Sequence, residues 1–185
     1  ASYPAPRRRQ MSSTAAPSAV LEAAAHYPSA AERKADAWVH VLGLAVGGVG
    51  AATLLVLALM RGGLGQAGAI LVYGLCMMAM LACSAAYNLA QNARSQAFWR
   101  RVDHACIFLM IAGSYTPFTT QRFEGAWAIG MTSAVWAIAL IGAGGKLFLP
   151  QISSRVWVGL YLALGWLVLA AIQPLMASVS ATALI

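Results

Sequence analysis

Five long apolar runs constrain the fold of this chain more than any other feature of its sequence. Each is close to the roughly 20 residues that an α-helix needs to cross about 30 Å of hydrocarbon. Spanning β-strands would be about 10 residues long and would alternate in polarity, which these runs do not. The sequence therefore predicts an all-α integral membrane helical bundle with five full spans: Trp38 to Met60, Ala67 to Ala90, Val102 to Thr119, Ala126 to Gly144 and Val156 to Ile172.

Composition supports this class. Of the 185 residues, 61% are hydrophobic and only 9% are charged, and a soluble domain of this length could not hide so much apolar surface in one core. A further apolar run begins at Pro174, but the sequence reaches Ile185 before this run is long enough to span. We interpret it as a partial sixth helix or a re-entrant tail.

The first 30 residues differ from the rest in being rich in Ala, Ser and Pro, with a basic run at residues 7–9. A twin-arginine signal would need an apolar segment soon after these arginines, and none follows. Residues 1–30 therefore predict a disordered cytoplasmic tail. Residues 31–185 predict the transmembrane domain, entered through a helix for which Ser29 is a plausible N-cap.

The basic residues predict an orientation. Ten of the twelve Lys and Arg residues lie in the N-terminal segment and in the loops after the second and fourth runs, and only Arg61 and Arg122 fall on the opposite side. Positive loops remain in the cytoplasm, so we expect a cytoplasmic N-terminus in a multi-pass protein of a bacterial inner membrane. This asymmetry accounts for the net charge of +7. The sequence shows no basic face with aromatic residues on which nucleic-acid bases could stack. We therefore expect the lipid bilayer as partner and no nucleic acid.

Small and aromatic residues predict how the spans pack. Gly43 and Gly47 form a GxxxG pair that suits close helix packing, inside the bundle or in a dimer equally, so the oligomeric state stays open. Three tryptophans near run ends are typical of an interfacial aromatic belt: Trp99, Trp127 and Trp157. Three cysteines lack metal-type CxxC spacing and are interpreted as small buried hydrophobes: Cys76, Cys83 and Cys106.

Polar residues from three predicted spans share one depth near the cytoplasmic face: His40, Ser84, Asn88, Asp103 and His104. A carboxylate at membrane depth costs about 3 kcal/mol on insertion scales, so Asp103 must face protein or trapped water. Ser84 and Asn88 are four residues apart and share one side of a helix. Because polar residues accumulate at span ends in any case, spacing alone fits either a structural, interfacial role or a cytoplasm-facing polar site.

Three stretches match motifs of a known membrane-protein family. DAWVHVLGL, Asp36 to Leu44, is similar to N-x-x-x-H-x-x-G, with Asp36 where Asn is usual. SAAYN, Ser84 to Asn88, is similar to S-x-x-Y-H. RVDHACIFLMIAGSYTPF, Arg101 to Phe118, is similar to D-H-x-x-I followed by G-(S/T)-Y-T-P. Over about residues 30 to 185 the chain thus resembles the hemolysin III branch of the progestin and adipoQ receptor (PAQR) family, in the wider group that includes alkaline ceramidases.

The resemblance implies a seven-helix bundle, relative to which this chain is incomplete, and a zinc ion near the cytoplasmic side. The family's zinc ligands are the His of S-x-x-Y-H and two His of an H-x-x-x-H motif on the last helix, with the motif Asp and Ser close to a metal-bound water. Asp103 and Ser84 match the last two and are the candidate catalytic residues, while His40, Asn88 and His104 complete the polar site. Asn88 stands in place of the zinc-binding His and is a poor zinc ligand, and the sequence ends before an H-x-x-x-H. We therefore predict no metal and no cofactor for this chain.

The resemblance leaves the activity between several classes. It implies hydrolase-like or receptor-like chemistry on a lipid-like substrate that contains an amide or ester. In the hydrolase case, zinc would lower the pKa of a bound water to about 7 and so supply hydroxide. In this chain we expect the site to be metal-free or incomplete. The alternative is a pore-forming or cytolytic protein, as the name hemolysin suggests, although no run carries a charged stripe to line a pore. A structural membrane protein without chemistry is the third possibility.

Overall fold

The computed structural model describes residues 29–149 and 151–171, and within these ranges the chain is helical with no β-strand. The elements are α2 (Ala30–Arg61), α3 (Gly63–Asn88), α4 (Ala93–Gln121), α5 (Gly125–Phe148), α6 (Ser154–Trp166) and the 3₁₀ helix η1 (Leu167–Ala171). The predicted all-α membrane bundle is thereby confirmed. The tail predicted before Ser29 and the partial helix predicted from Pro174 onward lie outside the described residues.

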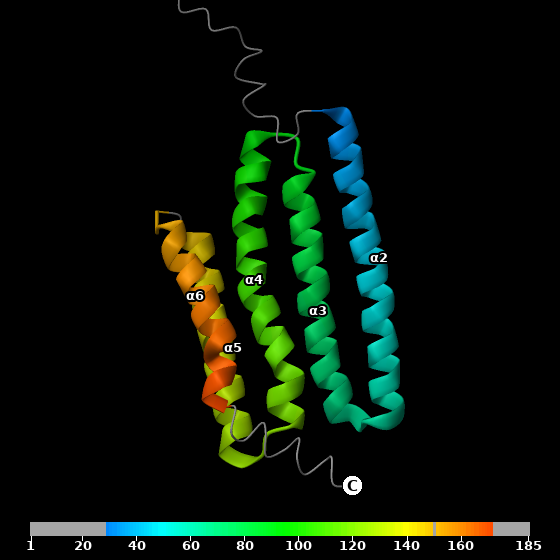
Figure 1. Cartoon of the computed structure of the whole chain (residues 1–185), viewed down its shortest axis with the longest axis vertical. Helices are drawn as coiled ribbons and strands as arrows, with labels where there is room; N and C mark the ends of the chain where they lie inside the picture. Colours follow the sequence, from blue (N-terminus) through cyan, green and yellow to red (C-terminus); the bar gives the residue numbers. More distant parts are fainter. Residues whose placement is uncertain (1–28, 150, 172–185) are drawn as a thin grey trace, which may run out of the picture.

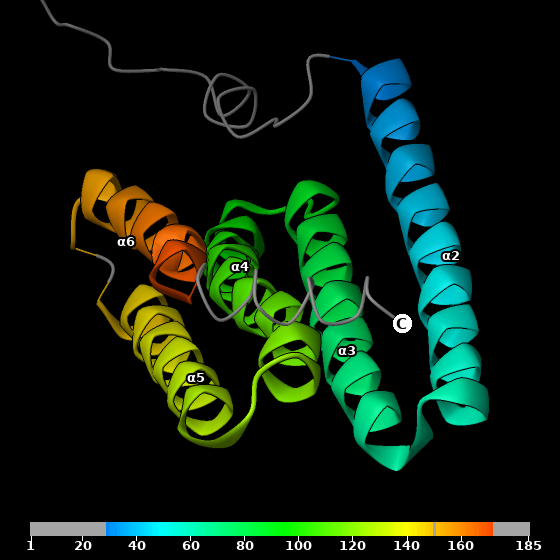
Figure 2. The ribbon, with the colours of Figure 1, turned by 60° about the horizontal axis from the view of Figure 1, so that its bottom comes forward.

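The helices run alternately up and down. Figure 1 shows α2, α3 and α4 in a row, and Figure 2 separates α5 from α6 on the side of α4 away from α3. α4 is the central helix, because it packs against α3, α5 and α6. The starts of α2, α4 and α6 and the ends of α3 and α5 meet at one end of the bundle (Figure 1), which we call the basic end. Arg61 and Arg122 lie at the opposite end, as the alternation of the spans predicts.

The helices differ in how well they suit a bilayer. α2, α3 and α5 are long and apolar enough to cross it. α4 has 29 residues but is interrupted by polar side chains, of which Thr116 and Thr119 are buried among the neighbouring helices. The fifth predicted run gives a shorter α-helix than expected, because α6 has 13 residues and continues as η1. There the Val168 N–H donates to the Tyr115 hydroxyl (2.9 Å) instead of continuing the α-helical pattern.

Capping residues and glycines fix the ends of the first helices. Ser29 is the N-cap of α2, as predicted, and its hydroxyl accepts from the Glu32 N–H at 3.2 Å. Gly62 alone separates α2 from α3, and Gly63 has a positive φ of 75°, which lets the chain reverse within so short a turn. Asn92 caps α4 by accepting from the Ser95 N–H at 2.7 Å. Short, capped turns therefore hold α2, α3 and α4 as antiparallel neighbours.

The small residues of α2 bring it close to α3. A Cβ on Gly47 would lie 3.0 Å from Leu81 Cδ1, and one on Gly43 would lie 3.9 Å from Leu81 Cδ2. The GxxxG pair therefore packs inside the bundle, the first of its two predicted uses. The outward face of α2 leaves large apolar side chains uncovered, among them Leu42 and Val49, and this face suits lipid contact.

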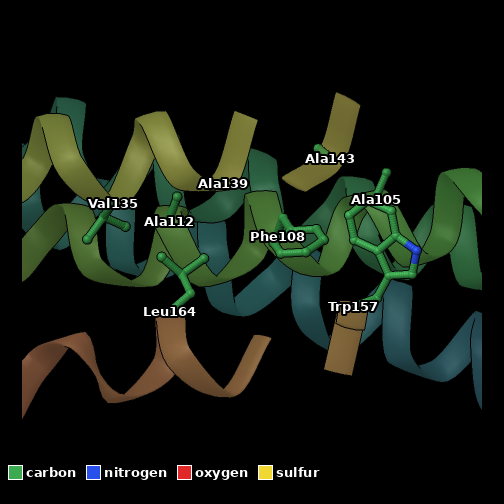
Figure 3. Packing of buried hydrophobic residues seen from close by; sticks show 8 residues of the cluster. All are labelled: Ala105, Phe108, Ala112, Val135, Ala139, Ala143, Trp157 and Leu164. Carbon is green, nitrogen blue, oxygen red and sulfur yellow. The ribbon is translucent and has the colours of Figure 1, made fainter. Parts of the chain in front are cut away.

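The main apolar core lies between α4, α5 and α6, where Phe108 is fully buried among the residues drawn in Figure 3. The Phe108 ring meets Trp157 edge-on at 6.2 Å and the Tyr161 ring at 4.3 Å between centroids. Trp157 is 5% exposed, so its predicted place in an aromatic belt is wrong. The reason is Gly145, where a Cβ would lie 2.6 Å from the indole, so that the missing side chain admits Trp157 into the core.

Candidate functional site

His40 is the first polar side chain of the site, on α2 near the basic end. Its Nδ1 lies 2.8 Å from the Asp36 backbone oxygen and 3.3 Å from Asp36 Oδ2. Both oxygens are acceptors, so these contacts assign the proton of a neutral ring to Nδ1 and leave a lone pair on Nε2. The His40 side chain is 13% exposed. Asp36, four residues earlier on the same helix, thus sets the orientation and tautomer of the imidazole.

Asn88, the last residue of α3, bridges to this imidazole. Its Nδ2 lies 3.3 Å from His40 Nε2 and donates to the Ser84 backbone oxygen at 3.0 Å, with Ser84 Oγ at 3.4 Å. An amide nitrogen has two hydrogens, which the shorter contacts to His40 and the Ser84 backbone use. Three residues that the sequence placed at one depth are therefore in contact across α2 and α3.

Asp103 extends this arrangement to α4. Its carboxylate lies near the Ser84 side chain and near His40, which would act on it electrostatically only in the protonated form. The contacts run from Asp36 through His40, Asn88 and Ser84 to Asp103, and we call these five residues the polar chain. Each polar side chain in it lies beside another polar side chain, which lowers the free-energy cost of holding the Asp103 carboxylate in an apolar bundle.

His104 belongs to the other side of α4. Its charged neighbours include Lys146 of α5 and Arg100, and its backbone oxygen accepts from the Tyr161 hydroxyl at 2.8 Å. Successive residues of a helix point about 100° apart, which separates His104 from Asp103. The structure therefore brings four of the five predicted polar residues together and leaves His104 beside them on α4.

Two residues of the site were missing from the sequence-based set. Asp36 was noted only as a departure from a motif, although its spacing of four residues from His40 is the signal for a side-chain pair on one helix face. Tyr161 approaches from α6, close enough for the charge of Asp103 to act on it. The spacing of residues in the sequence does not predict this approach, because Tyr161 lies far from both Asp103 and His104 along the chain.

The residues of the polar chain do not fit a zinc site. A zinc ion with three protein ligands needs deprotonated nitrogen, sulfur or carboxylate donors converging on one point. Asn88 offers its Nδ2 hydrogen to His40 Nε2, the one ring nitrogen that has a lone pair for a metal. Among the residues that the structure describes, no three His, Cys, Asp or Glu side chains are grouped closely enough to hold an ion.

A cavity of about 340 Å³ lies elsewhere, between α4, α5 and the end of α6. Tyr115, Phe118 and Met131 are among its mostly apolar lining residues. Tyr115 is twelve residues beyond Asp103 on α4, which corresponds to about 18 Å along the helix axis. The cavity is therefore no part of the polar chain.

Comparison with known proteins assigns the family. The model of the family described as "Haemolysin-III related" matches residues 31–184. A "Hemolysin-3 homolog" of Bacillus subtilis (strain 168) is 27% identical over 149 residues, which cover 80% of this chain and 70% of that protein. "Hemolysin-3" of Bacillus cereus is 27% identical over 144 residues, which cover 78% of this chain and 66% of that protein. No solved structure gives a significant match. The chain, whose described residues form an all-helical bundle with three helices able to cross a membrane, belongs to the haemolysin III family of membrane proteins.

Proposed function

We propose that the polar chain is a metal-free, receptor-like binding site, open toward the cytoplasm, for the polar group of a lipid-like molecule. The hydrogen bond between Asn88 and His40 carries this proposal. At the position where the family pattern has a metal-binding histidine, this chain has Asn88. Its side-chain amide forms a hydrogen bond with the His40 imidazole instead. The site is thus held together without an ion.

The groups of the polar chain suit a ligand that has both a carbonyl and a hydroxyl. An amide or ester carbonyl would accept from Asn88 Nδ2 or the Ser84 hydroxyl by displacing one of the internal hydrogen bonds that these side chains make. The Asp103 carboxylate is an acceptor for a ligand hydroxyl or a bound water, and hydrogen bonds to a charged group are the stronger kind. Asp103 with Ser84 is also where acid–base chemistry would begin, since a carboxylate beside a hydroxyl is a candidate general base.

Metal content and ligand binding together test the proposal. We expect the purified chain to hold well under one zinc per molecule by elemental analysis, and Asn88→His alone to leave this unchanged, because catalytic zinc sites use three protein ligands. A fluorescent long-chain amide with a free hydroxyl should bind in detergent micelles without being hydrolysed. Asp103→Asn keeps the side-chain shape but removes the charge, and should weaken binding by about tenfold or more.

Arg122→Gln is the control, because it removes a charge at the opposite end of the bundle. If the unmodified chain contains stoichiometric zinc that is lost in Asp103→Ala, the metal-free site is refuted. Hydrolysis of the amide that disappears in the same variant would make the protein an enzyme of the kind that the family resemblance implies. Equal binding by the wild type and Asp103→Asn would remove the polar chain from the ligand site.

A cytolytic function is the second candidate, favoured only by the printed names of the two Bacillus proteins. The described helices argue against a water-filled pore: α3 has no charged residue, and α5 has only Lys146 near its end. Leakage of an encapsulated dye from liposomes that contain the purified protein would support cytolysis, and intact liposomes at equal protein loading would count against it.

A further inference from the structure

A second group of charges lies at the basic end, outside the polar chain. Arg100 on α4 and Lys146 on α5 are close enough for their charges to act on each other, and both also act on His104 of α4. The Lys146 Nζ lies over the Trp157 ring, 5.6 Å from its centroid. Because Trp157 is buried against Gly145 and Phe108, it fixes the position of this ammonium.

Within the part of the chain that the structure describes, neither of these two cations forms an ion pair with a carboxylate. Across the described helices, the one close contact between a basic group and a carboxylate joins His40 to Asp36, and neither Arg100 nor Lys146 makes such a contact. Two neighbouring positive charges repel each other, more strongly where apolar groups exclude water. Lys146 is partly buried in such surroundings, whereas Arg100 is exposed. An anion placed between them would relieve the repulsion.

The surface beside the cations is apolar and uncovered. Toward the middle of the bundle, Ile141, five residues before Lys146 on α5, is 75% exposed, and Leu162, five residues after Trp157 on α6, is 59% exposed. This sequence of charge followed by apolar surface matches an amphiphile whose head is negative and whose tails run along α5 and α6. A free inorganic ion would use the cations but not the apolar flank.

We propose that Arg100 and Lys146, with Trp157 beneath the lysine, form a binding site for the phosphate of an anionic phospholipid at the basic end of the bundle. Basic pockets between transmembrane helices on the cytoplasmic side are a known way to hold such head groups. The site lies on the α5 and α6 side of α4, whereas the polar chain lies on the α2 and α3 side. The two sites are thus separate, and this proposal does not depend on the function proposed above.

Lipid-dependent stabilisation measures this binding. The full chain in a non-ionic detergent is titrated with dioleoyl phosphatidylglycerol, and Tm is followed by tryptophan fluorescence, since a ligand of the folded state alone raises Tm as its concentration passes Kd. We expect a saturable rise with this lipid and none with dioleoyl phosphatidylcholine or inorganic phosphate. Arg100→Gln and Lys146→Gln should each raise the apparent Kd about fivefold, the expected effect of one cation near an anionic head group.

Arg94→Gln is the matched control, because Arg94 is exposed on the same helix at the same end and should change Kd less than about twofold. Lys146→Arg keeps the charge and should bind nearly as the wild type does. Should Lys146→Gln fail to fold, the exposed Arg100→Gln carries the test alone. Equal losses in Arg94→Gln and Arg100→Gln would show diffuse attraction and overturn the site. A rise in Tm with phosphate alone would overturn its assignment to a lipid, and no response to phosphatidylglycerol would overturn it entirely.

Discussion

Gly142→Ala tests the packing that joins α4, α5 and α6 behind the site. A Cβ at this position would lie 2.5 Å from Cε1 and 2.7 Å from Cδ1 of Phe108. The Phe108 ring is fully buried against Trp157 and Tyr161 and has no open space to move into. Overpacking of this kind costs about 1–3 kcal/mol. The better helix propensity of alanine offsets about 0.5–1 kcal/mol of that cost.

Gly144→Ala is the matched control, because Gly144 lies two residues further on the same helix and its Cβ would meet nothing within 4 Å. The propensity gain is the same in both variants and cancels between them. We therefore expect Gly142→Ala to be less stable than Gly144→Ala by about 1–3 kcal/mol in reversible unfolding with dodecyl sulfate in mixed micelles.

A double-mutant cycle identifies the Phe108 ring as the cause. In a Phe108→Leu background the smaller side chain leaves room, so the penalty of Gly142→Ala should shrink by at least half. A difference between Gly142→Ala and Gly144→Ala below about 0.5 kcal/mol, the range of neutral surface changes, would refute the packing argument. The same holds if the penalty persists unchanged in Phe108→Leu.

Three further predictions concern orientation, the site and the end of α6. A reporter fused near Arg100 should lie in the cytoplasm and one near Arg122 outside, because of the asymmetry of basic residues; the reverse would invert the placement of both proposed sites. Asp103→Ala should lower the unfolding free energy by about 1–3 kcal/mol more than Arg122→Ala, since it leaves the Ser84 hydroxyl without its carboxylate; equal melting in detergent would mean that Asp103 merely faces water. Tyr115→Phe removes a hydroxyl whose single hydrogen is shared between the Leu164 and Gly165 oxygens and whose oxygen accepts from the Val168 N–H, and should cost about 1 kcal/mol or more. Tyr73→Phe, whose hydroxyl has no hydrogen bond to the described residues, should be near neutral in the same assay.

The sequence was sufficient to predict the helices and the meeting point of the polar residues. Hydropathy marks spans, and alternating spans return every second loop to the same side, so the depths of His40, Asn88 and Asp103 follow from counting residues. Contact between them then requires only that α2, α3 and α4 be neighbours, which their short connections enforce. The pairing of Asp36 with His40 was accessible in the same way, from their spacing on one helix.

What the sequence could not predict depends on residues distant in the chain. The α-helical part of α6 is short because the Tyr115 hydroxyl, 53 residues away, takes the Val168 N–H. Trp157 is buried because Gly145 of α5 lacks a side chain at the point of contact. Neither residue type signals its partner, and a tryptophan at a span end favours the interface in most proteins. The length of α6 and the burial of Trp157 are thus determined by contacts between residues distant in the sequence, and not by the local sequence pattern.

The order of the helices has a consequence for how the protein is made. α2, α3 and α4 each pack against their predecessor or successor in the chain, and the polar chain uses these three helices alone. Contacts between sequence neighbours form early and need no distant segment. When α4 leaves the ribosome, α2 and α3 have already emerged. The polar side chains that lie near Asp103 in the folded protein, Ser84, Asn88 and His40, are therefore present when α4 inserts. A helix that would be costly to insert alone can therefore enter the membrane beside the polar residues of α2 and α3, before α5 and α6 have emerged from the ribosome.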